Sequence, residues 1–426
     1  MAENGALVNK NREGVKMFNK RWLLLGLGIG IFSMLMFFAF QGIDVSRVAQ
    51  AEMKPIIIGD DNDFTGPSSA AAPQQVAAME LAIHEFNGQV AGRPVKIIHE
   101  DSACDETQSV DKAKKLVERD GASILVGPLH EPSTIAVHAY LQNSGIPHLA
   151  MIMPEAMHNK KNSNLFCIHG TNGFDGYIMG KYAAEVLHYK TATVIHDDMV
   201  DGEQFTQGAM DAFVAAGGKI IQRQRTPINT MDYAPYLSNM KKADVVFFWL
   251  IPPNAMNFIN HYADYGLKMP LMMAGIECLG DPMLNQLKDK VVGMYATVTN
   301  YQDVEGPGVK KWLNEWKALY GADKKLSMPG FVEPCNYYVE ALVALEALKA
   351  TNGDTSPNKL NDAIRALKLE TPWGKMSFND RGIAIGNSYV TKVVNDGGHY
   401  KLQVLKAYEQ LPKVEPAEVA NKAPKM

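Results

Sequence analysis

The sequence predicts an α/β protein with two lobes, each a parallel sheet flanked by helices. Between residues 95 and 152, apolar runs and helical patterns alternate in the order strand, helix, strand, helix, strand. This order is typical of a parallel sheet covered by helices. A second alternating series of similar length follows residue 166. At 426 residues the chain is also too long for one typical domain.

The first series begins at residue 55 and supplies the first predicted lobe. A helix expected over residues 73–88 carries apolar side chains at helical spacing and ends at Gly88. The strands expected in this series are 55–60, 95–101, 123–128 and 147–152, and its further helices are 106–121 and 132–145. Ligands of such sheets bind beyond the carboxyl ends of the strands. We therefore expect the site in the turns that follow residues 101, 127 and 151.

The second series spans residues 175–275 and predicts the second lobe. Its expected helices are 175–188, 203–216, 233–241 and 254–265, and its expected strands are 191–197, 219–224, 244–250 and 270–275. Three helices are then expected at 307–320, 333–350 and 358–367, followed by turn-separated strands over 371–408. Residues 409–426 have no apolar period and predict a disordered tail.

Residues 1–51 predict export. Residues 22–40 are uncharged and apolar, follow basic residues, and lead to VAQA, an A-x-A site with cleavage before Glu52. A run of 19 residues also just spans a bilayer at about 1.5 Å per residue. The segment is therefore either a signal peptide or an uncleaved membrane anchor, and a start at Met1 or at Met17 stays open. In each case the globular part is periplasmic or otherwise extracytoplasmic.

Composition excludes several classes of function. A formal charge of -4 leaves no basic patch, so we expect no nucleic-acid partner. Four cysteines without a CxxC pair and eleven histidines without an HExxH motif predict no metal site. The LGLGIG run at residues 25–30 lies inside the apolar segment with no strand before it, so no cofactor is expected.

Three pairs of side chains could supply an acid, a base or a nucleophile: His196 with Asp197, Ser133 with His130, and Ser102 with Cys104. No GxSxG elbow surrounds either serine. Ser133 and Thr134 fit the first turn of the helix that begins at residue 132, where they would satisfy free N–H groups. We therefore predict a binding protein and no enzyme, with catalysis at His196 and Asp197 as a distant alternative.

Several motifs in a fixed order carry a family resemblance. They are FTGPSSAAAPQQVAAMELAIHEFNG, EDSACDETQSVDKAKKLVERDGASILVGPLHEPSTIAVHAYLQNSGIP, GKYAAEVL, ATVIHDD, GLKMPLMMAG and MSFNDRG. Over residues 54–408 the chain resembles the leucine/isoleucine/valine-type periplasmic binding proteins of ABC importers. The resemblance implies the type I periplasmic binding protein fold, with two Rossmann-like lobes joined by a three-crossover hinge. Lobe 1 would comprise 54–172 plus 302–374, and lobe 2 would comprise 173–301 plus 375–408.

The resemblance also implies an activity without chemistry. A small-molecule solute would be held in the cleft by a monomer, and an ABC permease in the membrane would receive it. Closure would be favoured by contacts that the solute makes only in the closed form. A membrane-anchored sensor with the same clamp is the alternative, and the lack of a second apolar span favours transport.

One loop of the resembled family gives a backbone N–H and a hydroxyl to a ligand carboxylate. Here the corresponding loop is Leu129, His130 and Glu131, and Glu131 replaces the expected serine. An acid beside a helix N-terminus could simply stabilise the helix. If Glu131 instead faces the cleft, it would repel a ligand carboxylate by like charge.

Other ligand positions depart from the family as well. Ile152 and Met153 replace a small residue and a threonine, and Asp201 replaces a tyrosine. Glu277 aligns with the acid that pairs with the ligand ammonium. Together Glu131, Asp201 and Glu277 predict an acceptor-rich pocket, which favours an amino acid, amide or amine with cationic or several N–H groups.

Aromatic side chains keep a second solute class open. Phe64, Phe174 and Trp249 lie at predicted strand ends or loops near the cleft and could stack on an aromatic acid. Residues of this kind at such positions belong more often to the core than to a pocket. An importer receptor for an aromatic acid is therefore the alternative within the same functional class.

The cysteines also depart from the family. Cys104 matches a family half-cystine, but His130 stands at the partner position, so that bridge cannot form. Pairing among Cys167, Cys278 and Cys335 stays open, because the sequence does not give their separations.

Overall fold

The computed structural model describes residues 54–66, 69, 71–154, 157, 164–275, 280–321 and 333–423. The described residues fall into two units: residues 54–55 with Gly92–Pro94 belong to the first, and Ile56–Ala91 with the described residues from Val95 onward belong to the second. The elements below lie in the second unit, apart from the first two residues of β3. The expected signal or anchor falls outside the described residues. Within those residues, no helix combines the length and apolarity that a bilayer crossing requires.

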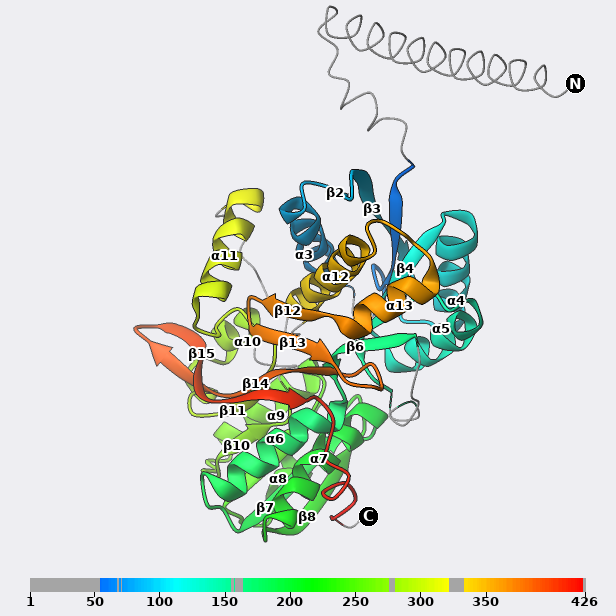
Figure 1. The fold of residues 1–426 in the computed structure, drawn as a ribbon. Helices are drawn as coiled ribbons and strands as arrows, with labels where there is room; N and C mark the ends of the chain where they lie inside the picture. Colours follow the sequence, from blue (N-terminus) through cyan, green and yellow to red (C-terminus); the bar gives the residue numbers. More distant parts are fainter. Residues whose placement is uncertain are drawn as a thin grey trace, which may run out of the picture. The chain divides into compact units, whose positions relative to one another are not determined.

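The first sheet has six strands in the order β2-β3-β1-β4-β5-β6 (Figure 1). They are β1 (Ile56–Asn62), β2 (Gln89–Val90), β3 (Arg93–Asp101), β4 (Ala122–Val126), β5 (His148–Ile152) and β6 (Leu165–Gly170). From β3 to β6 all neighbours pair in parallel. This confirms the βαβ alternation that the sequence predicts between residues 95 and 152.

Helices cover both faces of this sheet. The helix α3 (Ala72–Glu85) packs with α12 (Glu333–Ala350), and α4 (Glu106–Lys114) packs with α5 (Glu131–Ser144). Along β4, Ile124 and Val126 belong to the hydrophobic cluster of α3 and α12, whereas Leu125 belongs to that of α4 and α5. Since neighbours on a strand point to opposite faces, the two helix pairs lie on opposite sides of β4.

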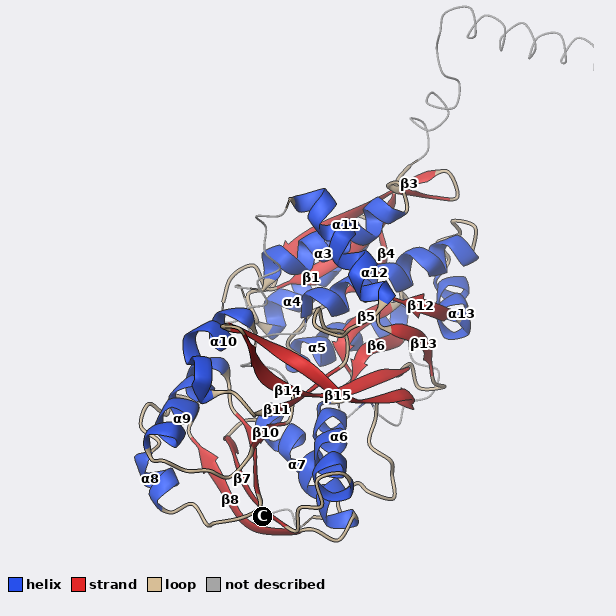
Figure 2. Ribbon diagram, turned by 90° about the vertical axis from the view of Figure 1, so that its left-hand side faces the viewer, coloured by secondary structure: helices blue, strands red, loops and turns tan. Residues whose placement is uncertain are grey.

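The second sheet has nine strands in the order β12-β13-β14-β11-β10-β9-β7-β8, with β15 paired to β14. They are β7 (Thr191–Asp197), β8 (Lys219–Thr226), β9 (Val245–Trp249), β10 (Leu271–Met273), β11 (Tyr295–Val298), β12 (Lys368–Thr371), β13 (Gly374–Phe378), β14 (Ala384–Asp396) and β15 (His399–Pro412). The strands β7 to β11 pair in parallel. The C-terminal strands join antiparallel, which confirms the predicted turn-separated strands, and β14 and β15 run side by side as a long pair (Figure 2).

The helices of the second half are α6 (Asn172–Glu185), α7 (Val200–Ala215), α8 (Ala234–Ser238), α9 (Pro252–Asp264) and α10 (Asp281–Leu287). The helices α6 and α7 pack closely because glycines line their contact. A Cβ on Gly176 or Gly180 would overlap backbone atoms of α7. This close packing fixes the N-terminal ends of α6 and α7 relative to each other, and the candidate site lies at these ends.

The described chain passes between the two sheets three times. It leaves the first sheet after β6 and returns to its helices after β11. The return is seen in the packing of α11 (Pro307–Tyr320) on α3 and of α13 (Pro357–Ala366) on α12. It passes to the second sheet again at β12. The strand β12 was expected in lobe 1, yet it pairs with β13. The lobe boundaries themselves stay a prediction.

Helix positions follow the sequence closely where the apolar period is clear. The helices expected at 307–320 and 333–350 have these bounds in the structure. The helix expected from residue 203 begins earlier, at Val200, and the helix expected at 106–121 changes to a π-helix over Lys115–Arg119. The earlier start of α7 arises because first-turn residues contribute little to an apolar period.

The expected disordered tail is wrong for residues 409–423. The strand β15 continues to Pro412, and Lys413 is 2 % exposed. Further along, the backbone N–H groups of Asn421 and Ala423 donate to Asp211. The segment is ordered by backbone hydrogen bonds and by the buried side chains of Lys413 and Ala423, features that composition does not report.

Candidate functional site

The loop after β4 is held tightly against the first sheet. Gly127 has a φ of +74°, and a Cβ at this position would overlap the carbonyl oxygen of Asp61. The ring Nε2 of His148 lies 2.6 Å from the Gly127 carbonyl oxygen and donates to it. The half-buried Leu129 and His130 follow directly, so the predicted ligand loop is positioned by the sheet beneath it.

The first turn of α5 differs in detail from the expectation. The Ser133 hydroxyl lies 3.1 Å from the His130 ring nitrogen Nδ1. The Thr134 hydroxyl donates to the carbonyl oxygens of Pro128 and His130, at 3.1 and 3.2 Å. Neither contact is the expected capping of a free N–H group. Both hydroxyls instead fix the loop on the helix.

Four polar side chains meet between the ends of α5, α6 and α7, and we call them the interlobe cluster: Glu131, Asn172, Asp201 and Gln204. The Asn172 amide nitrogen Nδ2 lies 3.0 Å from Asp201 Oδ1 and 2.8 Å from Gln204 Oε1. It also lies 3.5 Å from Glu131 Oε2, and Glu131 is 9 % exposed. Asn172 therefore connects an acid that follows the first sheet with an acid of the second.

The acids of the interlobe cluster are poorly solvated. Burial raises the pKa of Asp201, against the opposing effects of the His130 charge and the Asn172 hydrogen bond. A buried carboxylate is costly unless a donor or a cation compensates it. Among the described residues, Asp201 accepts a hydrogen bond through Oδ1 only, from Asn172. Its Oδ2 can therefore accept a cation or an N–H donor.

The structure brings together some predicted residues and separates others. Glu131 and Asp201 meet at Asn172 in the interlobe cluster. His130 is not a member of the cluster, but it helps to lower the pKa of Asp201 against the effect of burial. Ile152 is half-buried at the end of β5, and Met153 is buried in a hydrophobic cluster with Ala150. Glu277 and Cys278 lie outside the described residues.

Two of the three candidate aromatic residues lie in the core. Phe174 is 1 % exposed and stacks on Tyr177, and Trp249 is 4 % exposed and stacks on Phe205 with ring centroids 5.4 Å apart. Phe64 is half-buried, with its ring edge to face against His99. Phe174 and Trp249 are therefore core residues in this structure, which was one of the two roles that the sequence left open for them.

Sequence reasoning missed Asn172 and Gln204. Asn172 follows the GT pair that ends β6, and Gln204 lies one turn after the start of α7. Both positions are at helix N-termini beyond parallel strands, where ligands of such sheets bind. That rule, applied to the strand ending at residue 170, would have pointed to Asn172.

The carboxylate of Asp197, a candidate catalytic acid, is engaged in structural hydrogen bonds. Its Oδ1 accepts from Asn254 at 2.6 Å and from the Thr226 hydroxyl at 3.0 Å, and its Oδ2 accepts from the Ile251 N–H at 2.8 Å. These partners lie at the ends of β8 and β9 and the start of α9. Asp197 thus joins the strand ends that carry the second half of the site.

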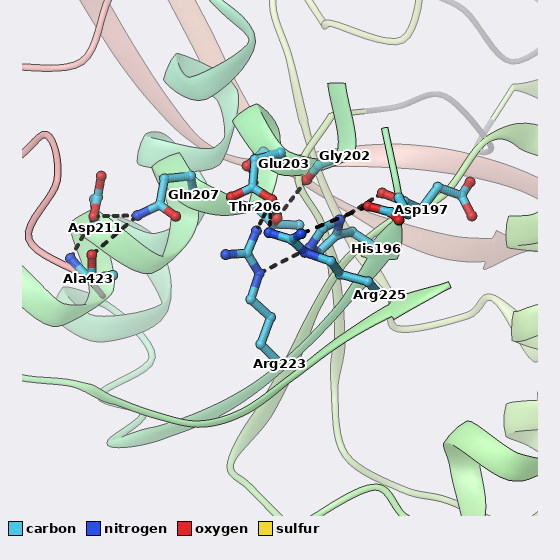
Figure 3. Close-up of polar contacts among 11 residues, drawn as sticks. His196, Asp197, Gly202, Glu203, Thr206, Gln207, Asp211, Arg223, Arg225 and Ala423 are labelled. Atoms are coloured by element: carbon cyan, nitrogen blue, oxygen red, sulfur yellow. Dashed lines mark hydrogen bonds and ion pairs between the residues drawn. The ribbon is translucent and has the colours of Figure 1, made fainter. Parts of the chain in front are cut away.

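The His196 ring is engaged as well (Figure 3). Its Nδ1 donates to the Asp197 carbonyl oxygen at 2.7 Å, and its Nε2 accepts from Arg223 Nε at 3.0 Å. Burial lowers the pKa of His196, which agrees with a neutral ring. Arg223 also pairs with Glu203 at 2.6 Å. This network holds the first turn of α7, where Asp201 lies.

We expect Asp197→Ala to destabilise the protein by about 3 kcal/mol, because it leaves the buried Ile251 and Asn254 donors without their acceptor. Urea denaturation measures the change. The neighbouring Asp198→Ala is the control, because the Asp198 side chain is 66 % exposed and only 3.9 Å from Arg225. It should change the free energy of unfolding by no more than about 0.5 kcal/mol. Equal effects of the two variants would contradict the structural role of Asp197.

The other candidate pair is also structurally engaged. The Ser102 hydroxyl donates to the Asn62 carbonyl oxygen at 3.1 Å and to Asp63 Oδ1 at 3.0 Å. Among the described residues, no disulfide joins Cys104, Cys167 and Cys335. In the same part of the chain, no three His, Cys, Asp or Glu side chains are placed to hold a metal ion.

Comparison with known proteins identifies the family. Residues 55–398 match the family described as periplasmic binding protein. The chain is 29% identical over 328 residues to the leucine-, isoleucine-, valine-, threonine-, and alanine-binding protein of Pseudomonas aeruginosa, covering 75% of this chain and 84% of the relative. It is 24% identical over 349 residues to the Leu/Ile/Val-binding protein of Escherichia coli, covering 79% of this chain and 89% of the relative.

Solved structures of the same fold agree. An ABC transporter substrate-binding protein from Sphaerobacter thermophilus has a TM-score of 0.77 at 23% identity, with 85% of this chain and 100% of that chain covered. A solute binding protein of an ABC transporter from Rhodopseudomonas palustris HaA2, solved with p-hydroxybenzoic acid, has a TM-score of 0.77 at 22% identity, with 86% and 100% covered. The chain belongs to the periplasmic binding protein family, of the leucine/isoleucine/valine-binding type, whose members are extracytoplasmic solute-binding proteins rather than enzymes.

Proposed function

We propose that this protein captures a small amino acid, or a related amide or amine, by cleft closure and delivers it to an ABC permease. The observation that carries the proposal is the interlobe cluster, in which Glu131 and Asp201 both approach the amide nitrogen of Asn172. A solute ammonium would bring a positive charge to these two acids. Because it would touch groups of both halves, its binding would favour the closed form.

The electrostatics of the cluster argue for an ammonium over a free carboxylate. Charge-assisted hydrogen bonds from an ammonium to carboxylates are short and strong. A solute carboxylate at the same position would meet two like charges in a poorly solvated place. The relatives named for leucine, isoleucine and valine, ligands that carry an ammonium, support the same class.

An aromatic acid is the second candidate solute. Two solved structures of the same fold hold p-hydroxybenzoic acid and 3,4-dihydroxy benzoic acid. In this chain the half-buried Phe64 and the ring of His130 could receive such a solute. The buried positions of Phe174 and Trp249 reduce the aromatic surface available to it.

The proposed function is tested by a ligand screen with a closure measurement. L-leucine, L-glutamine, L-lysine, putrescine and 4-hydroxybenzoate are added to the purified exported chain in a thermal-shift assay. A ligand at 100 times its Kd stabilises the fold by about 2.7 kcal/mol. Small-angle scattering with the best ligand should then show compaction. Superimposable scattering curves with and without it would refute capture by closure.

We expect Asp201→Asn to weaken binding of an ammonium-bearing ligand more than tenfold, because the substitution removes one of the two buried negative charges. Isothermal titration calorimetry measures the Kd. Asp198→Asn is the matched control, since it removes an exposed charge three residues away. An unchanged Kd in Asp201→Asn would place the ammonium elsewhere, with Glu277 as the next candidate.

Export is proposed on the N-terminal sequence. Mass spectrometry of the protein from cells would find Glu52 as the first residue if the signal is cleaved. A retained apolar segment at residues 22–40 would instead favour the membrane-anchored sensor. We propose a monomer for the released form, and the mass from light scattering would test it.

A further inference from the structure

The last described part of the chain, residues 413–423, forms a strap that fastens to the first crossover between the sheets. The Thr171 N–H donates to the Lys413 carbonyl oxygen at 3.0 Å. The Lys413 ammonium, on a side chain that is 2 % exposed, donates to the Ile168 carbonyl oxygen at 3.2 Å. Lys413 thus contacts both the end of β6 and the residue that follows it. We call residues 413–423 the C-terminal strap.

A second contact of the strap falls beside the interlobe cluster. The Thr171 hydroxyl donates to Glu415 Oε2 at 2.6 Å. Thr171 is the N-cap residue of α6, yet its side chain makes no cap hydrogen bond, and it immediately precedes Asn172. The hydroxyl that could have capped the helix is therefore bound to the strap.

Two glycines make this approach possible. Gly170 has a φ of +110°, and a Cβ there would overlap the Lys413 backbone. A Cβ on Gly173 would overlap the Glu415 carboxylate. A side chain at position 170 would displace the strap backbone, whereas one at position 173 would displace the Glu415 carboxylate from Thr171. The residue types at this crossover therefore fit the presence of the strap.

The far end of the strap fastens to α7. The Asp211 carboxylate accepts from the Asn421 N–H at 2.7 Å. It also accepts from the Ala423 N–H at 2.6 Å (Figure 3). Gln207 donates to Asp211 at 2.9 Å and completes the contact. The helix that receives this end also carries Asp201 and Gln204 at its start.

We propose that the C-terminal strap positions the solute site. It holds Thr171 at one end and α7 at the other, and so keeps Asn172 between Glu131 and Asp201. Hinge residues absorb the backbone rotation of domain closure, so a strap bonded to Thr171 also limits how far this crossover bends. The effect on solute affinity rests on the proposed function, whereas the effect on the crossover does not.

Hydrogen exchange of the full-length protein tests the strap without a ligand. The Thr171 amide is protected by its bond to Lys413. In Glu415→Ala combined with Asp211→Ala, the peptide that covers residues 169–173 should exchange at least tenfold faster, while a peptide from β7 keeps its rate. Glu418→Ala is the matched control, because Glu418 lies in the strap with an exposed side chain. The single variant Glu415→Gln keeps an acceptor for the Thr171 hydroxyl, so its 169–173 peptide should exchange at the wild-type rate. Wild-type exchange in the double variant overturns the proposal.

Affinity separates positioning from a merely structural role. Calorimetry with L-leucine, L-lysine and 4-hydroxybenzoate gives the Kd of any of these that binds the wild type. Glu415→Ala should raise it at least fivefold, and Glu415→Gln should stay within twofold. A lowered melting temperature with an unchanged Kd refutes positioning. If none of the three binds the wild type, the proposed solute class fails while the exchange result still decides whether the strap holds the crossover.

Discussion

Gly127→Ala is expected to destabilise the protein by about 4 kcal/mol and to abolish solute binding. The residue has a φ of +74°, which costs a non-glycine residue about 1 to 2 kcal/mol. In addition, the new Cβ would overlap the carbonyl oxygen of Asp61, a backbone atom that cannot rotate away. Relieving such an overlap costs about 1 to 3 kcal/mol more. Denaturant titration and calorimetry measure the two effects.

Gly121→Ala is the matched control for the collision. Gly121 has a nearly equal φ of +77°, and nothing lies within 4 Å of the place that a Cβ would occupy there. Gly121→Ala should therefore lower the free energy of unfolding only by the cost of a positive φ, about 1 kcal/mol. Its affinity for the solute should not change. If the two variants lower the free energy of unfolding by the same amount, the overlap with the Asp61 carbonyl oxygen does not destabilise Gly127→Ala. If Gly127→Ala binds solute normally, the loop at Leu129 and His130 is not part of the site.

The arrangement of the sheets was predictable from the sequence because it depends on periodicity. Buried parallel strands read as short apolar runs, and helices with one buried stripe read at a period of 3.6. The bounds of α11 and α12 follow from this rule. The order of strands in the second sheet does not, since pairing of β14 with both β11 and β15 is decided by contacts distant in sequence.

The candidate site was predictable only in part. Glu131 and Asp201 were identified because they replace uncharged residues at family positions, and the structure places both beside Asn172. Asn172 itself carries no such signal, because asparagine at a helix start is ordinary. Phe174 and Trp249 show the opposite case. Their positions near strand ends suggested contact with solute, but side-chain direction turned both into the core.

The tail illustrates why composition is a weak guide to order. Residues 413–423 lack an apolar period, yet they are held by backbone hydrogen bonds to Thr171 and Asp211 and by the side chains of Lys413 and Glu415. An apolar period records neither kind of contact. The sequence feature that fits an ordered tail lies in the residues that the strap contacts, because Gly170 and Gly173 have no side chain to overlap it. A glycine pair at a crossover is interpretable only once the neighbour is known.

A second large effect is expected from pH at His148, which is fully buried beneath the site loop. Burial, with a smaller contribution from the neighbouring His138, lowers the pKa of His148 from 6.5 to about 3. Between these values the unfolded chain binds a proton that the folded chain does not. The contribution of neutral His148 is therefore fully present above pH 6.5 and is lost as pH falls toward 3. One pKa unit corresponds to about 1.4 kcal/mol, so the whole loss is about 5 kcal/mol.

The effect is isolated by comparing wild type with His148→Gln, because other buried groups, such as Asp60 and Glu340, titrate in both proteins and cancel in the difference. Glutamine can still donate to the Gly127 carbonyl oxygen, which His148 contacts at 2.6 Å. Between pH 7 and pH 5, wild type should lose about 2 kcal/mol more of its free energy of unfolding than the variant. Parallel stability curves would mean that His148 is charged in the folded protein. Because His148 stays neutral in the folded protein over this range, the loss comes from protonation of the unfolded chain, and His148 should not change the solute affinity of the folded protein between pH 7 and pH 5.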